Sequence, residues 1–446
     1  MYGFRKTLGV ILSILFIFSI FGGSVVSGES IANSSVQDED NKTILIKFKD
    51  DSKSEQTKNS IKEKLRLSKL NTKKKIESTK IEVLEVDNQV DLNGLVTELR
   101  KDSNIEYAQP DYKLHIDPIN PIIFPQDMFF DYQWGLYNHG QNIGQEGTPG
   151  IDINVLPAWN ITLGSNNIIV GVLDTGIDTN HIELKNNVFV NTSEIPQNGV
   201  DDDNNGYVDD VNGWDFANSD NSVFDNVNQD AHGTHVAGII ASDNDKVGIR
   251  GVAPNIRILP LKFITGNYGN TSDAIEAIQY AEKLGVSIIN CSWSGYEYNY
   301  ALKDAIENSN ILFVCSSGND GIDLSSRKIY PACFNMKNLI SVAAIDNKGG
   351  LASFSNFGED ICVAAPGVNI VSTVPGNQYM YASGTSMAAP FVTGVAALLL
   401  SAKPKMSSWQ IHHEIEKYAT FDVKLDGKVS SKGIVNAYHT LVKDKR

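Results

Sequence analysis

Cysteine is scarce in this chain of 446 residues. Its four cysteines show no Cys-x-x-Cys spacing, so no metal site of that kind is indicated. They are Cys291, Cys315, Cys333 and Cys362. Cys315 and Cys362 lie in apolar runs that are typical of buried strands, which makes free buried thiols the default expectation. A disulfide stays open as the alternative, because the sequence does not choose between the two states.

Positive charge is also in short supply. The chain has 38 Lys and Arg against 53 Asp and Glu, a net charge of -15, and a pI of about 5.0. This balance argues against a nucleic-acid partner, because phosphates require a basic surface. Residues 29–120 hold 16 basic and 18 acidic residues, whereas residues 121–446 hold 20 and 35. The excess acid of the later part is compatible with bound cations.

Long hydrophobic runs are nearly absent as well. The one run noted, Leu8 to Phe21, follows Arg5 and Lys6 and precedes small residues, with Ser27 as a candidate cleavage position. This pattern predicts an export signal over residues 1–28 and a secreted protein. The alternative, a membrane anchor, is disfavoured because the apolar core is short. We therefore expect no stable membrane anchor, while adherence to a cell wall stays open.

The chain has no internal repeats, and its pattern changes at a proline-containing stretch near residue 120. Residues 29–120 predict a small α+β unit, with strands at Thr43 to Phe48, Ile81 to Val86 and Ile105 to Tyr107 and helices at Ser52 to Leu70 and Leu92 to Arg100. Residues 121–446 predict a second unit, and the expected state is a monomer.

In the second unit, continuous apolar runs alternate with helical segments, which predicts a mainly parallel sheet between two layers of helices. The runs are Ile168 to Leu173, Ile256 to Leu261, Val286 to Asn290, Ile311 to Val314, Leu339 to Ala344 and Ile361 to Ala364. Asp174, Ser292 and Asn319 follow such runs directly or closely. A site at the carboxyl ends of the strands is therefore expected.

Three short segments carry candidate chemistry. Asp174 lies in Asp-Thr-Gly, His232 in His-Gly-Thr-His, and Ser386 in Gly-Thr-Ser-Met-Ala-Ala-Pro. A serine hydroxyl becomes a nucleophile when a histidine takes its proton and a carboxylate orients that histidine. Taken alone, Ser386 reads more simply as a helix N-cap; the other two segments are what favour catalysis.

In these segments the chain resembles the subtilisin-like serine proteases, or subtilases. Gly251-Val-Ala-Pro254 and Ser317-Gly-Asn319 extend the resemblance, which runs from about Trp134 to Ala437. It implies a three-layer subtilisin-like fold, a secreted serine endopeptidase acting on proteins and peptides, and a self-processing precursor. Residues 29–120 would be an inhibitory, folding-assisting propeptide, and residues 121–446 the catalytic domain.

The resemblance also implies further site residues. Asn319 matches the amide that stabilises the oxyanion together with the Ser386 N–H. Substrate would pair with Ser292, Trp293, Ser294 and Gly295, where Ser294 replaces a usual glycine. Ser317, Gly318 and Ile329 would border the P1 pocket, which Ile329 would make shallow.

An acidic loop provides a second strong signal. Residues 201–210 contain Asp-x-Asp-x-Asn-Gly, and such alternating oxygen side chains suit calcium. The candidate ligands are Asp201, Asp203, Asn205, Tyr207, Asp209 and Asp210. The closing glutamate of an EF-hand is missing, since Asn212 stands there. A solvated acidic loop without a bound ion is the alternative.

A second calcium site is expected from the family resemblance. Its candidate ligands are Glu183, Asp243, Asp245, Val247 and Ile249.

Two other functions compete with a broad endopeptidase. A narrow maturation or signalling protease stays open, because Ser294 and Ile329 depart from the family pattern. A non-catalytic binding protein on the same scaffold is disfavoured. Such proteins usually lack one member of the triad or the oxyanion amide, and this chain has all four residues: Asp174, His232, Ser386 and Asn319.

Overall fold

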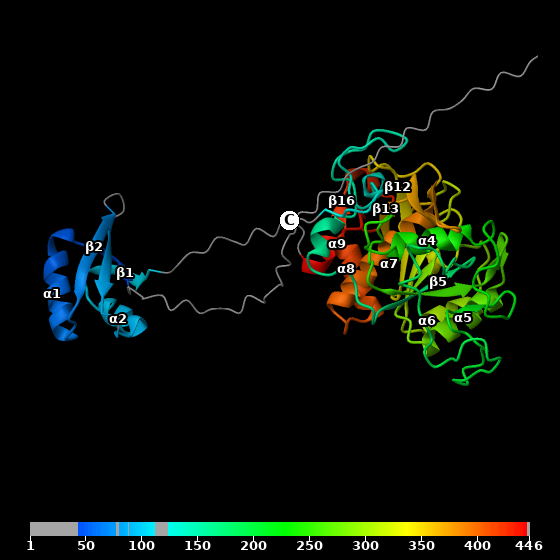
Figure 1. The fold of residues 1–446 in the computed structure, drawn as a ribbon. Coiled ribbons are helices and arrows are strands. Elements are labelled where there is room, and N and C mark those ends of the chain that lie inside the picture. The colour runs from blue at the N-terminus through cyan, green and yellow to red at the C-terminus, as the bar shows by residue number, and fades with distance from the viewer. Residues whose placement is uncertain (1–42, 77–79, 88, 112–123, 444–446) are drawn as a thin grey trace, which may run out of the picture. The chain divides into compact units, whose positions relative to one another are not determined.

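The computed structural model describes residues 43–76, 80–87, 89–111 and 124–443. Contacts divide the chain into two compact units, Met1–Pro118 and Ile119–Arg446 (Figure 1). The predicted leader, residues 1–28, lies outside the described residues. The same holds for the predicted boundary between residues 120 and 121, which stays a prediction.

The first unit is a four-stranded antiparallel sheet in the order β2-β3-β1-β4. Its elements are β1 (Thr43–Phe48), α1 (Ser54–Lys64), β2 (Leu70–Ile76), β3 (Ile81–Val86), α2 (Leu92–Leu99) and β4 (Ile105–Pro110), with a 3₁₀ turn at Asp51–Lys53. Ile44, Ile46 and Phe48 alternate along β1 and are buried, so one face of the sheet builds the core of this unit.

One predicted helix of this unit is too long. The helix expected from Ser52 to Leu70 ends at Lys64, and the chain then forms β2, which was not predicted. β2 is an edge strand in which Leu70 is buried and Lys73 to Lys75 are exposed. Lysines commonly protect edge strands, and here they hide the alternating pattern that would have indicated the strand.

The second unit is built on a nine-stranded sheet in the order β16-β17-β13-β12-β11-β10-β5-β7-β6. Every neighbouring pair is parallel except β16 and β17. The strands are β5 (Ile169–Asp174), β6 (Trp214–Asp215), β7 (Arg257–Lys262), β10 (Ile288–Cys291), β11 (Leu312–Ser316), β12 (Leu339–Ile345), β13 (Val363–Pro366), β16 (Thr420–Phe421) and β17 (Gly433–Ile434). The predicted parallel sheet is confirmed, since all six apolar runs overlap strands of this sheet.

Helices surround this sheet (Figure 1). They are α3 (Val155–Trp159), α4 (Ala231–Ala241), α5 (Thr271–Lys283), α6 (Tyr300–Glu307), α7 (Thr385–Ala402), α8 (Ser408–Lys417) and α9 (Ala437–Val442). α4 packs against α7, and α5 packs against α6. Small additions are the hairpin β14 (Ile370–Val374) and β15 (Gln378–Ala382), the ribbon β8 (Ile264–Thr265) and β9 (Tyr268–Gly269), and 3₁₀ turns at Phe130–Tyr132, Ala332–Phe334 and Val423–Leu425.

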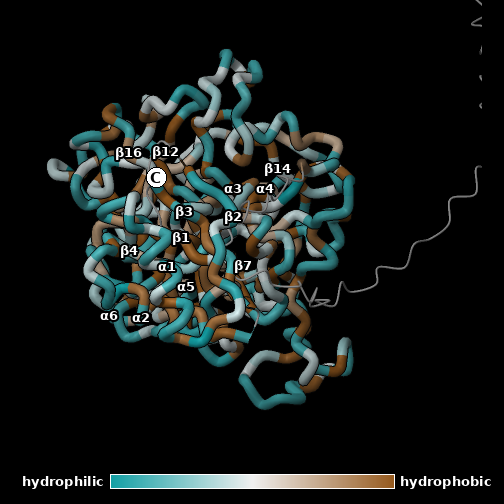
Figure 2. Tube along the Cα trace, turned by 90° about the vertical axis from the view of Figure 1, so that its left-hand side faces the viewer, coloured by the Kyte–Doolittle hydropathy of each residue, from teal (hydrophilic) through white to brown (hydrophobic). Residues whose placement is uncertain are grey.

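Within the described residues, α7 is the helix long and apolar enough to cross a membrane. The expectation that long hydrophobic runs are nearly absent overlooked this helix. Of its 18 residues, 83% are buried inside the protein, and it contacts β10, β11, β12 and β13. α7 therefore has the surroundings of a core helix. Along the chain trace in Figure 2, the outer loops are largely hydrophilic.

Three adjacent central strands present polar residues at their carboxyl ends. β5 ends at Asp174, β10 is followed by Ser292, and β11 is followed by Ser317.

All four cysteines are free thiols, with Cys362 half-buried and the others buried. Cys291 and Cys315 are register partners on β10 and β11 without being bonded.

Candidate active site

Asp174 and His232 form the centre of the site. Asp174 is the last residue of β5 and is fully buried, and His232 is the second residue of α4. His232 Nδ1 lies 2.7 Å from Asp174 Oδ1. An ionised carboxylate only accepts, so Nδ1 carries the hydrogen and Nε2 is left as the basic nitrogen. Burial lowers the pKa of His232, but the charge of Asp174 and this hydrogen bond outweigh burial and raise the pKa above its ordinary value.

Two glycines allow the loop after β5 to approach α4 this closely. Gly176 has a φ of +116°, and a Cβ there would lie 2.7 Å from the carbonyl oxygen of Val223. A Cβ on Gly233 would lie 2.3 Å from the carbonyl oxygen of Gly176. Larger residues do not fit at either position. The glycines of Asp-Thr-Gly and His-Gly-Thr therefore hold the carboxylate and the imidazole in contact.

A buried lysine that the sequence reasoning missed anchors the start of α4. Lys262 ends β7, where it is the register partner of Asp174. Its Nζ lies 2.7 Å from Asp230 Oδ1, and both side chains are fully buried. Nζ also donates to the carbonyl oxygen of Thr175 at 2.5 Å. Burial lowers the pKa of Lys262, and the hydrogen bond and charge of Asp230 more than reverse this. The only signal in the sequence was a lysine that closes an apolar run.

Ser386 is the second residue of α7. Its hydroxyl donates to the carbonyl oxygen of Ser292 at 3.0 Å, and the Ser292 hydroxyl donates to the carbonyl oxygen of Ser386 at 2.8 Å. Within the described residues, no hydrogen bond joins Ser386 to His232. Sites without substrate are often loose in this way and tighten when substrate binds.

Asn319 lies three residues beyond β11, and its amide has a defined orientation. Its Oδ1 accepts from the Thr385 N–H at 2.8 Å and from the Thr385 hydroxyl at 3.0 Å. A Cβ built on Gly384 would lie 3.6 Å from Asn319 Nδ2, so the amide nitrogen lies beside Gly384, two residues before Ser386. The side chain thus keeps a donor available next to the serine.

The segment after β10 has one edge already paired. Gly295 and Tyr330 each donate their N–H to the other's carbonyl oxygen at 2.8 Å. The Trp293 ring packs edge-on against Phe263, with centroids 5.1 Å apart, while Ser294 is exposed.

The three predicted pocket residues lie close to the ends of these strands. The Ser317 hydroxyl donates to the carbonyl oxygen of Asn356 at 3.0 Å. Gly318 has a φ of +87°, and a Cβ there would lie 2.7 Å from Cδ1 of Ile329. Ile329 is 1% exposed. Its side chain therefore fills the space directly beside Gly318.

The acidic loop brings together some of the predicted ligands and one residue that was missed. Asp203, Asp210 and Glu194 each place a carboxylate oxygen within 4.8 Å of the other two. Asp201 caps its own loop by accepting from the N–H groups of Asn205 and Gly206. Asp209 accepts instead from the N–H groups of Asn198 and Gly199, outside this group.

The remaining predicted ligands of this loop are engaged locally. Asn205 Nδ2 donates to Asp210 Oδ2 at 3.0 Å, and Tyr207 donates its hydroxyl to Glu276 at 3.0 Å. Glu194 stands seven residues before the Asp-x-Asp pattern, with no signal that marks it.

At the second predicted cation position, Glu183 is fully buried. Its Oε1 accepts from the Tyr379 hydroxyl at 2.6 Å, whereas Oε2 is buried without a hydrogen-bond partner among the described residues. Burial, and then the charges of Asp245 and Asp127, raise the pKa of Glu183 to about 8. Asp127, which the sequence reasoning missed, also pairs with Arg250 at 3.0 Å. The carboxylates at this position repel one another, and a bound hard cation with oxygen ligands would offset their negative charge.

The other residues predicted here lie in the loop that follows α4. Asp243 accepts from Asn186 Nδ2 at 2.7 Å, and Asp245 accepts from the Val247 N–H at 2.9 Å. Ile249 is buried.

This fold, with a carboxylate–imidazole pair and a serine at the carboxyl edge of a parallel sheet, has the arrangement of a serine hydrolase. The model of the subtilase family matches residues 165–437, and that of the fervidolysin N-terminal prodomain matches residues 40–111. The chain therefore belongs to the subtilase family of serine proteases and carries a prodomain.

Similar proteins agree with this assignment. The thermophilic serine proteinase of Bacillus sp. (strain AK1) is 33% identical over 404 residues, covering 89% of this chain and 86% of that protein. Fervidolysin of Fervidobacterium pennivorans is 31% identical over 445 residues, covering 84% of this chain and 58% of that protein. A solved structure described as proteases from Pseudoalteromonas arctica has a TM-score of 0.56 and 28% identity, covering 72% of this chain and 99% of that one.

Proposed function

We propose that this chain is a secreted, self-processing serine endopeptidase in which Asp174, His232 and Ser386 form the catalytic triad. The observation that carries the proposal is the 2.7 Å contact between His232 Nδ1 and the buried carboxylate of Asp174. This contact leaves Nε2 as the base in a site that also holds a serine at a helix N-terminus.

In this mechanism, His232 Nε2 takes the proton of Ser386 as Oγ attacks the carbonyl carbon of the substrate. The imidazolium then donates that proton to the leaving amine, which leaves an acyl-enzyme that water hydrolyses by the same steps. Asp174 holds the tautomer and stabilises the imidazolium, consistent with the raised pKa of His232, which burial alone would lower.

The oxyanion would be held by Asn319 Nδ2 and the N–H of Ser386. Thr385 supports this role because it engages Oδ1 of Asn319 and leaves Nδ2 available. The N-terminal end of α7 adds a favourable field for the developing negative charge.

Substrate would lie along Ser292, Trp293, Ser294 and Gly295 as an added strand. Ile329, packed against Gly318, would close the P1 pocket and favour small P1 side chains. This contact also supports the second candidate, a protease of narrow specificity. A peptide-library cleavage profile separates the two, because a broad enzyme cleaves after many residue types.

Calcium ions are proposed at both oxygen-rich positions. Asp203, Asp210 and Glu194 would hold one ion. The second would be held by Glu183 and Asp245, with Asp127 beside them. Each ion would offset carboxylate charges in a protein with a net charge of -15 and would stabilise its loop.

The remaining parts of the proposal concern the precursor. Residues 29–120 would act as inhibitor and folding assistant, and residues 121–446 as a monomeric enzyme that acts outside the cell or at its wall. A parallel sheet with many non-local contacts folds slowly, which gives a physical reason for such assistance.

A fluorophosphonate probe tests the triad directly, because it is attacked by an activated serine and loses fluoride. We expect one label, located on Ser386 by peptide mass, and none in Ser386→Ala or His232→Gln. Folded His232→Gln protein that labels at the wild-type rate would contradict the proposed base.

A further inference from the structure

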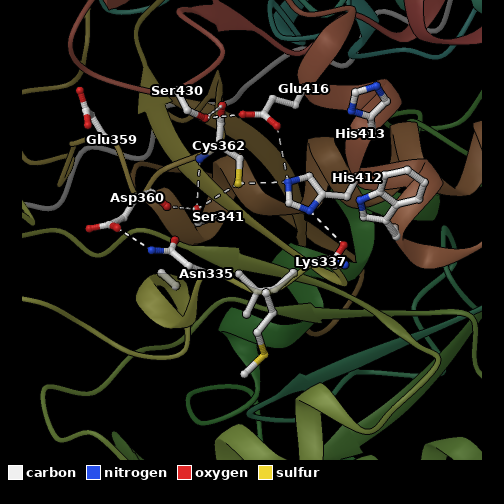
Figure 3. Close-up of a pocket in the computed structure, with 14 residues that line it drawn as sticks. Asn335, Lys337, Ser341, Glu359, Asp360, Cys362, His412, His413, Glu416 and Ser430 are labelled. Carbon is white, nitrogen blue, oxygen red and sulfur yellow. Dashed lines mark hydrogen bonds and ion pairs between the residues drawn. The ribbon is translucent and has the colours of Figure 1, made fainter.

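A cavity of about 340 Å³ lies outside the candidate active site, where α8 packs against β11 and β12 (Figure 3). Cys362, His412 and Glu416 are among the residues that line it. Cys362 immediately precedes β13, while His412 and Glu416 are one turn apart on α8 and face the same side. The thiol and the imidazole thus meet at one opening, with the carboxylate of Glu416 beside the imidazole.

The orientation of the His412 ring is fixed by the backbone. Its Nδ1 lies 3.1 Å from the carbonyl oxygen of Lys337. A carbonyl only accepts, so Nδ1 carries the hydrogen and Nε2 is the nitrogen that offers a lone pair. Nε2 lies 3.5 Å from Cys362 Sγ and 3.8 Å from Glu416 Oε2. This backbone contact is the kind of support that metal-binding histidines commonly have.

The other two side chains are also held by neighbours. The Ser341 hydroxyl lies 3.5 Å from Cys362 Sγ, and the Ser430 hydroxyl donates to Glu416 Oε1 at 2.5 Å. Ser430 leaves Glu416 Oε2 turned toward the imidazole, as Figure 3 shows.

From this geometry we infer that Cys362, His412 and Glu416 form a binding site for a borderline-soft divalent cation such as Zn²⁺. In a tetrahedral zinc site with bonds of about 2.3 Å to sulfur and 2.0 Å to nitrogen, these two ligands lie about 3.5 Å apart. Sγ and Nε2 show this separation without any rearrangement. The ligand atoms of Cys362, His412 and Glu416 do not all lie within 4.8 Å of one another, so Glu416 moves toward the sulfur to become the third ligand. Its side chain is 35% exposed, which leaves it room to move, and water from the cavity can be the fourth ligand.

Binding is balanced by the release of a proton. The Cys362 thiol loses its proton to solvent as the sulfur–metal bond forms, and neutral Nε2 donates its lone pair. A thiolate and an imidazole select such a cation over Ca²⁺, which prefers oxygen ligands. This site therefore differs in chemistry from the two oxygen-rich positions, and the bound ion would tie α8 to the sheet.

Cobalt provides a direct test, because a Co²⁺–thiolate bond gives a charge-transfer absorption in the near ultraviolet. The full chain carrying Ser386→Ala, saturated with Ca²⁺, would be titrated with Co²⁺ and then with Zn²⁺. We expect one equivalent of the thiolate band, displaced by Zn²⁺ and unaffected by additional Ca²⁺. The absence of this band would overturn the inference.

Variants assign the ligands. Cys362→Ser should abolish the band, and His412→Gln should weaken Co²⁺ binding by about tenfold or more. His413→Gln is the matched control, because His413 lines the same cavity but its ring stacks on Trp409, with centroids 5.9 Å apart. The His413→Gln variant should bind Co²⁺ with the affinity of the parent protein. Circular dichroism checks that each variant is folded, and unchanged Co²⁺ affinity in folded His412→Gln would overturn the inference even if Cys362→Ser does not fold.

Discussion

Replacing Glu183 by Gln tests the electrostatics of the second position at which a calcium ion is proposed. In the calcium-free protein the carboxyl group keeps its proton up to a pH of about 8, against an ordinary value of 4.5. Between these values the folded chain binds more protons than the unfolded chain, so stability falls as the pH rises. The difference of about 3.5 units corresponds to a loss on the order of 5 kcal/mol between about pH 4.5 and 8. Calcium should restore this stability, because it binds the ionised carboxylate.

The assay is the melting temperature of the full Ser386→Ala chain, with and without Glu183→Gln, across pH 5 to 8. A loss of 5 kcal/mol in a unit of this size lowers the melting temperature by roughly 7 °C. Without calcium, the parent should lose stability relative to Glu183→Gln as the pH rises; with calcium, the parent should be the more stable protein at pH 8. Parallel curves for the two proteins in calcium-free buffer would refute the reasoning.

Three further predictions concern the active site. Lys262→Met should lower the unfolding free energy by about 3–5 kcal/mol, because it leaves the buried charge of Asp230 without a partner. The double variant Lys262→Met/Asp230→Asn should recover part of that loss of stability. Thermal unfolding measures the stability of both variants, and wild-type stability of Lys262→Met would contradict the role of the ion pair. Asn319→Ala should reduce kcat by about 10²–10³, the range known for the loss of such an amide in subtilisin, with little change in KM; an unchanged kcat would rule out the oxyanion role. The raised pKa of His232 predicts that kcat/KM falls as the pH drops through a value above the ordinary 6.5; a pH profile whose acid limb lies below 6 would contradict it.

The large sheet was readable from the sequence because parallel strands buried on both faces form continuous apolar runs. Ile168 to Leu173 and Ile256 to Leu261 are confirmed as β5 and β7, shifted by one residue. β2 was missed because an exposed edge strand has no such run, and three consecutive lysines mask its alternation. The helical segments predicted between the apolar runs, Thr234 to Ala241, Ser272 to Leu284 and Tyr300 to Asn308, are confirmed as α4, α5 and α6, and each helix starts within three residues of its predicted start.

In the candidate site, too, some residues could be predicted from the sequence and others could not. Asp174, His232 and Asn319 stand in short segments whose glycines are required by close approach of neighbouring atoms. Ser386 stands in the segment Gly-Thr-Ser-Met-Ala-Ala-Pro, so local sequence indicated all four residues. Their supports come from elsewhere in the chain. Lys262 acts on α4 through a buried ion pair, and Asp127 and Glu194 join carboxylates that are distant in sequence or outside the pattern. No spacing rule identifies such partners.

The pair Cys362 and His412 shows this limit most clearly. The two residues are 50 positions apart and stand in no Cys-x-x-Cys or His-x-x-x-His pattern. Only the packing of α8 beside β11 and β12 brings the thiol and the imidazole together.

The most direct test of the central proposal is to express the full precursor with calcium in a secreting host, beside Ser386→Ala, and to compare product masses and N-terminal sequences. We expect the wild-type chain to lose roughly the first 120 residues, while Ser386→Ala, once its leader is removed, keeps its prodomain. Identical trimming of both chains, or no trimming beyond the leader in either, would contradict self-processing by Ser386.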